Sequence, residues 1–250
     1  MNKEEIIEKL VKAKRIVALD LEGDGLSAQV NQKIFPNGNH FDPNTRIWCA
    51  SIATKLIGDC KLLHNETITH TMCAKLNGTR AIIDDNGRMA GMTVAEHYVN
   101  TVVPQTMQVF GDDRHIVDVS NEARLIKGIK HMLSIIDASD VATGTESDTI
   151  ICVKGYGKYN YDAMLLNAAC KRLGISTPAN KFSNLINVAP IIGNWKPTHS
   201  QIKVNQYTEN QKYIEVGIKH NIEDTIQLCD YLYNKVQAYY KKLNNIHGDF

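Results

Sequence analysis

The feature that most constrains the fold is the short apolar run RIVALDL at residues 15–21, which leads into the acidic motif LDLEGDGL at residues 19–26. The run is rich in β-branched residues, which predicts a buried central strand. Asp20 and Glu22 are two residues apart, so their carboxylates project from the same face of that strand. Adjacent buried carboxylates are costly unless a cation neutralises them, and hard oxygen ligands suit Mg²⁺ or Mn²⁺. The alternative interpretation is a strand that merely ends in a polar turn.

The rest of the chain alternates between strand-like and helix-like patterns. Apolar runs predict further strands at residues 46–56, 60–73 and 149–153, and an Asp-Asn-Gly triplet predicts a hairpin turn at residues 85–87. Helical spacing predicts helices at residues 93–103, from a Ser120 cap to about residue 136, from Asp162 to Gly174, and from about residue 209 to 243. The apolar face of the last helix is predicted to carry Ile218, Ile222, Ile226, Cys229, Leu232 and Val236. We expect an α/β fold, a mixed sheet flanked by helices, in one domain over residues 1–250 with an insertion at about residues 57–117.

Two further acidic motifs follow the strand motif. Asp162 stands between a glycine-containing loop, GYGKYNY, and an apolar helix, where the simplest alternative role is a helix cap. In the final helix, His220 and Asp224 are four residues apart and share one face. The alternative interpretation is an exposed charge pair, which is common on helices. Glu223 is a possible metal ligand in place of Asp224. Each motif alone is weak, so their combination and order carry the prediction.

A strand D-x-E, a later Y-D that opens a helix and a final helical H-x-x-x-D resemble, in that order, the DEDD superfamily of 3′→5′ exonucleases. This superfamily has a ribonuclease H-like fold and includes polymerase proofreading domains and ribonuclease D. The resemblance implies that Asp20, Glu22, Asp162 and Asp224 hold two divalent ions, Mg²⁺ or Mn²⁺, about 4 Å apart. It also implies that His220 is the general base. The spacing is that of the Tyr-x-x-x-Asp branch, with histidine in the tyrosine position.

The same resemblance implies contacts with the substrate. Gly23 matches the position whose backbone meets the terminal 3′-hydroxyl, and Leu26 matches an apolar wedge between the last two bases. Lys158 is a candidate phosphate contact or a solvated lysine, and Tyr161 is a candidate base-stacking residue or a core residue. Further local positive charge that can offset phosphate comes from Lys154, Lys171 and Arg172.

The resemblance therefore implies an exonuclease that releases nucleoside 5′-monophosphates from the 3′ ends of single-stranded or frayed nucleic acid. DNA is preferred over RNA because the third motif has the spacing of proofreading domains. A formal net charge of +1 argues against a broad footprint on duplex nucleic acid, but not against a grip on a few nucleotides. Any polymerase or replication partner would be a separate protein. The alternatives are an exoribonuclease, an inactive nucleic-acid-binding module of the same fold, and a metal hydrolase acting on a small phosphodiester.

None of the six cysteines forms a C-x-x-C pair, and most lie in apolar runs, which predicts buried reduced thiols. Zinc ligation by Cys60, His64, His70 and Cys73 is possible, but the spacing matches no common zinc finger and the alternation favours strands. No segment approaches the roughly 20 apolar residues of a membrane span, and the first residues lack the apolar run of a signal peptide. We expect a cytoplasmic protein, in the host cytoplasm if the chain is viral, with no membrane partner.

Overall fold

The computed structural model describes residues 1–24, 42–57, 67–74, 76, 81–83, 89–92, 116–142, 149–153, 160–176, 185–193 and 210–247. The helices and strands in these residues are α1 Lys3–Lys12, β1 Arg15–Gly23, β2 Ile47–Leu56, β3 Ile68–Ala74, β4 Ala81–Ile83, β5 Met89–Met92, β6 Ile116–Val119, α4 Glu122–Ala142, β7 Thr149–Val153, α5 Tyr161–Leu173, β8 Ile186–Asn187, α6 Ala189–Ile192 and α7 Asn210–His247.

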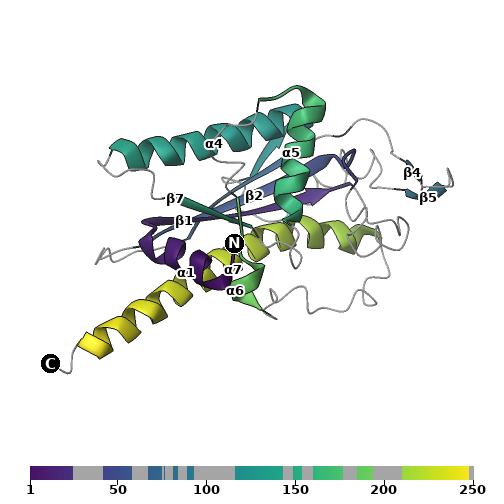
Figure 1. Ribbon diagram of the computed structural model, residues 1–250. Helices are drawn as coiled ribbons and strands as arrows, with labels where there is room; N and C mark the ends of the chain where they lie inside the picture. The colour runs from purple at the N-terminus through teal and green to yellow at the C-terminus, as the bar shows by residue number, and fades with distance from the viewer. Residues whose placement is uncertain are drawn as a thin grey trace.

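Within this described part, six strands form one sheet in the order β6-β3-β2-β1-β7-β8, and β4 and β5 pair separately. The sheet is mixed: β1 pairs antiparallel with β2 but parallel with β7, and β2 pairs antiparallel with β3. Helices α4 and α5 lie on one side of the sheet, and α1, α6 and α7 lie on the other (Figure 1). This arrangement confirms the predicted fold class, an α/β fold with a mixed sheet flanked by helices.

The central strand β1 contributes to two separate cores, which explains why its sequence is apolar on both faces. Val17, Leu19 and Leu21 pack with residues of α4 and α5. Ile16 and Ala18 pack on the opposite face with residues of α1, α6 and α7. Because side chains alternate along a strand, the next two even-numbered positions of β1 lie on the α7 face. These positions are the two acids of the first motif.

Several predicted element boundaries are confirmed. The β7 strand covers the predicted residues, and Gly174 ends α5 in the left-handed conformation with a φ angle of 63°. The antiparallel pairing of β4 with β5 confirms the hairpin, although its turn residues lie outside the described residues, as does the predicted helix at 93–103. None of the helices in the described ranges is both long and apolar enough to cross a membrane.

The predicted cap of α4 is wrong by one residue. The side chain of Asn121, rather than that of Ser120, accepts the backbone N–H of Arg124 at 3.0 Å, and the helix begins at Glu122. An asparagine and a serine are equally good caps, so adjacent candidates cannot be separated by residue type alone.

Candidate functional site

The acids of the first and third motifs lie near one another, on the side of the sheet where β1 faces α7. Burial of its carboxyl group raises the pKa of Glu22 well above the ordinary value, and the nearby charges of Asp20 and Asp224 raise it further. The structure therefore brings together three of the four predicted acids, two from the first strand of the sheet and one from the last helix. Such mutual repulsion is the arrangement that a divalent cation relieves.

A buried asparagine that was not predicted connects these acids. Asn221 is fully buried on α7, one helical turn before Asp224. Its Nδ2 atom donates a hydrogen bond to Oδ2 of Asp20 at 2.8 Å. A second hydrogen bond from its side chain to Glu22 lowers the pKa of that carboxyl group, opposing the larger effects of burial and neighbouring charge. Its position one turn from Asp224 was the only sequence signal that could have identified it.

The acid of the second motif lies in the first turn of α5. Asp162 is buried, with 5% of its surface exposed. The helix is capped by Asn160, whose side chain accepts the backbone N–H of Ala163, so Asp162 is not the N-cap residue. Leu165, one turn further along α5, lies 3.5 Å from the point that a Cβ atom on Gly23 would occupy. The first turns of α5 thus lie beside the end of β1 that carries Glu22.

The end of β1 is fixed to the start of β2 by an ion pair that was not predicted. Asp24 is fully buried and accepts hydrogen bonds from the backbone N of Arg46 at 2.7 Å and from its Nε atom at 2.6 Å. The register between the two strands shifts between Glu22 and Gly23. A Cβ atom on Gly23 would lie only 2.6 Å from Cγ2 of Thr45, so this position is tightly packed. These contacts hold the backbone that presents Glu22.

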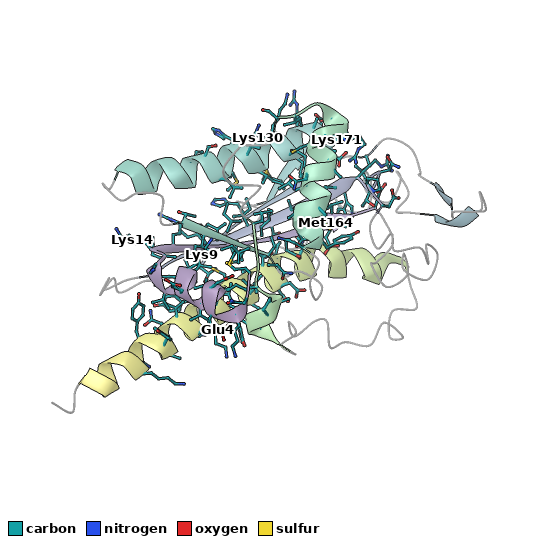
Figure 2. The ribbon with its side chains drawn as sticks, in the orientation of Figure 1. Glu4, Lys9, Lys14, Lys130, Met164 and Lys171 are labelled. Atoms are coloured by element: carbon teal, nitrogen blue, oxygen red, sulfur yellow. The ribbon has the colours of Figure 1, made fainter. Side chains whose placement is uncertain are left out.

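A second ion pair involves one of the predicted local cations. Arg172 donates from Nη2 to Oε1 of Glu122 at 2.6 Å and from Nη1 to the carbonyl oxygen of Pro43 at 2.9 Å. The same Oε1 atom accepts the backbone N–H of Ile47 at 2.7 Å. Arg172 therefore neutralises a buried carboxylate. Lys171 lies on α5, on the α4 side of the sheet (Figure 2). Asp20 and Glu22 of β1 instead face α7, where Asn221 contacts both carboxyl groups.

The remaining predicted residues are less fully described. Leu26 and Lys158 lie outside the described residues, and for His220 the structure describes only the helical backbone of α7. Tyr161 is partly buried: part of its side chain packs against the core beneath α4 and α5, and the rest is accessible.

The zinc alternative involves residues that the structure describes only in part. Cys60 and His64 lie outside the described residues, and Cys73 is a buried free thiol whose Sγ atom lies 3.6 Å from that of Cys49. The described cysteines are all free and buried, as predicted.

The donor atoms of these acids suit a divalent metal ion, although they are not gathered as finished ligands. The described residues contain no group of three or more His, Cys, Asp and Glu side chains already gathered as a metal cluster. Charges influence one another over longer distances than a metal–ligand bond spans. The three carboxyl groups of Asp20, Glu22 and Asp224 are therefore neighbours that do not converge on one point. Their chemistry nevertheless fits a hard divalent ion, because all three offer carboxylate oxygens and their mutual repulsion needs a neutralising charge.

No protein-family model and no curated protein sequence matches the chain. Among solved structures, the chain is similar to the nuclease domain of 3′hExo, a DEDDh family member, bound to rAMP. The sequence identity is 13%, the match covers 92% of this chain and 93% of that chain, and the TM-score is 0.39.

Proposed function

We propose that the chain is a metal-dependent 3′→5′ exonuclease. The observation that supports this proposal best is that α7 brings Asp224 close to the acids of β1. Asn221, one turn before Asp224, donates a hydrogen bond to Asp20 at 2.8 Å. The charges of Asp20 and Asp224 both raise the pKa of Glu22. Three acids, from elements at opposite ends of the sequence, share one face of the sheet. All three residues are partly buried, and like charges gathered in such a place are unfavourable unless a cation neutralises them.

In this proposal Asp20, Glu22, Asp162 and Asp224 hold two divalent ions, Mg²⁺ or Mn²⁺. When bound, the ions supply an activated water and stabilise the charge that develops on the leaving 3′-oxygen. The four carboxylates bind and position these ions from β1, α5 and α7. His220 takes the proton of the attacking water, because an imidazole titrates near neutral pH.

The proposed substrate is the 3′ end of a single-stranded or frayed nucleic acid, with DNA preferred over RNA and nucleoside 5′-monophosphates as products. The backbone of Gly23 meets the terminal 3′-hydroxyl and Leu26 separates the last two bases. Lys158 and Tyr161 contact a phosphate and a base near the second motif. The spacing of the third motif supports the preference for DNA, and a separate polymerase or replication protein is the proposed partner.

The proposal is tested with 5′-labelled single-stranded DNA and RNA incubated with Mg²⁺ or Mn²⁺. We expect a ladder that shortens from the 3′ end and disappears when the metal is chelated. Replacing Asp20 with asparagine preserves the size of the side chain and should lower the rate on the order of 10³-fold.

The matched control is Asp230→Asn. Asp230 is another acid of α7, but it pairs with Lys55 at 2.8 Å and its side chain is 41% exposed. Its rate should stay near wild type. If neither polymer is cleaved in the presence of either metal, the exonuclease proposal is wrong. Metal-dependent binding of DNA without cleavage would instead support the inactive module.

A further inference from the structure

The side chain that faces the acids from α7 is a neutral amide with every polar atom engaged. Asn221 is fully buried, and α7 places it directly over the β1 carboxylates. Its Nδ2 atom points to Asp20 at 2.8 Å, while its Oδ1 atom accepts a hydrogen bond from the Sγ atom of Cys49 at 3.5 Å. A buried amide that had rotated by 180° would place its oxygen against a carboxylate, which is strongly unfavourable.

The thiol of Cys49 stabilises the orientation in which the amide nitrogen of Asn221 faces Asp20, because it donates to the amide oxygen. Cys49 lies directly opposite Glu22 in the β1–β2 register and opposite Cys73 in the β2–β3 register. The Sγ atom of Cys73 lies 3.6 Å from that of Cys49 and donates to it. Three hydrogen bonds therefore form a chain with one direction: Cys73 donates to Cys49, Cys49 donates to Asn221, and Asn221 donates to Asp20. Hydrogen bonds aligned in this way strengthen one another in a buried environment.

We propose that Asn221 is a positioning residue that sets the carboxylates of Asp20 and Glu22 for metal binding, and that Cys49 fixes the orientation of its amide. This inference rests on the metal centre of the proposed function and adds two residues to it. Neither residue is a metal ligand in the proposal. Both act through the carboxylates that they align.

A neutral donor suits this role better than a charged one. A lysine or arginine at position 221 would neutralise Asp20 and Glu22 itself and so compete with a divalent ion. The amide instead occupies one oxygen of Asp20 and leaves the carboxylate charge available. Hydrogen bonds that orient metal-ligating side chains typically contribute 10- to 100-fold to metal affinity, roughly the effect expected here.

The test measures metal binding without substrate, so that it is independent of nuclease activity. Each protein is titrated with Mn²⁺, and free Mn²⁺ is counted by electron paramagnetic resonance. Asn221→Leu keeps the approximate volume but removes the amide, and should raise the Mn²⁺ dissociation constant about 10- to 100-fold. Cys49→Ala should raise it about 3- to 10-fold, the effect of one hydrogen bond, whereas Cys49→Ser should restore it to within about twofold.

The matched control is Cys152→Ala, which removes an equally buried thiol from β7 on the same face of the sheet. It should lower the melting temperature as Cys49→Ala does, yet leave Mn²⁺ affinity unchanged. If Asn221→Leu fails to fold, the difference between Cys49→Ala and Cys49→Ser decides the matter.

Wild-type Mn²⁺ affinity in Asn221→Leu, or equal affinities in the two Cys49 variants, would overturn the positioning role. Wild-type protein that binds no Mn²⁺ would overturn it as well. Wild-type protein that binds Mn²⁺ with this pattern but cleaves no nucleic acid would refute the exonuclease and leave the positioning role supported.

Discussion

Adding a single methyl group at Gly23 should disturb the end of β1 next to Glu22. The φ angle of Gly23 is not in the left-handed region, so space alone opposes a larger residue. An added Cβ atom would lie 2.6 Å from Cγ2 of Thr45, whereas carbon atoms in contact are normally about 3.5–4.0 Å apart. One side must therefore move by about 1 Å, and Thr45 is fully buried.

The expected cost follows from two opposing effects. Overpacking in a dense core costs about 1–3 kcal/mol, while replacing glycine by alanine returns about 0.4–1 kcal/mol through the unfolded chain. Gly23→Ala should therefore destabilise the protein by about 1–2 kcal/mol. This change corresponds to a fall in melting temperature of about 2–8 °C for a chain of this length, measured by circular dichroism.

A double-mutant cycle isolates the contact. Thr45→Ser removes the Cγ2 atom but keeps the hydroxyl group, at a cost of about 0.8 kcal/mol for the lost methyl. In Gly23→Ala/Thr45→Ser the new methyl occupies the vacated space, so the double variant should be more stable than the sum of the singles by about 1–2 kcal/mol. Any metal-dependent cleavage activity that Gly23→Ala loses should be recovered in the double variant.

Gly128→Ala provides a matched control in α4. Its added Cβ atom would also lie 2.6 Å from a neighbour, but that neighbour is the Sδ atom of Met72, whose flexible side chain can move. Alanine also favours the helix, so stability should change little or rise. Strict additivity in the cycle, or an equal loss in Gly128→Ala, would refute the steric explanation for Gly23.

Two further predictions concern charged groups. Because the pKa of Glu22 is raised, this group favours the metal-free folded state below its unfolded pKa of about 4.3, and that stability is lost as pH rises through the folded pKa. In melting curves recorded in chelator, stability should therefore decline as the pH rises above about 4, and Glu22→Gln should reduce this decline. An unchanged slope in Glu22→Gln would contradict the assignment. Arg172→Leu should lower the free energy of unfolding by about 2–3 kcal/mol, because it leaves the buried Glu122 carboxylate without its cation. This value is at the low end for a buried pair because the arginine side chain is 26% exposed. Adding Glu122→Gln should recover much of that loss in chemical unfolding, and no recovery would show that packing rather than charge is responsible.

The sequence predicted the elements whose patterns depend only on neighbouring residues. The β1 strand was recognisable because both of its faces are apolar, and Gly174 was recognisable because a helix end often needs a left-handed residue. The short strands β6 and β8 were missed, since four and two residues carry too little pattern to be identified without their partners.

The predicted stripe on the final helix shows why burial is harder to infer. Ile222 and Ile226 were expected to face the core, but they are only partly buried, whereas Asn221 and Thr225 are fully buried. Hydrophobicity alone favours the isoleucines. The polar pair is buried because this part of α7 faces the acidic end of β1, and that environment becomes visible only when the two elements are placed together. The same reasoning explains why Asp24 and its partner Arg46, 22 positions apart, were missed.

The pairing of α7 with β1 also has a consequence for the order in which the protein folds. The hydrogen bond from Asn221 to Asp20 joins residues 201 positions apart. Contacts of such long range are slow to form because a large loop must close first. During synthesis β1, β2 and β3 emerge long before α7, so the acids remain uncovered until the ribosome has released the last helix. A nascent chain that stops short of α7 should therefore be inactive and should expose the apolar face that α7 normally covers, which makes it a substrate for chaperones and proteases.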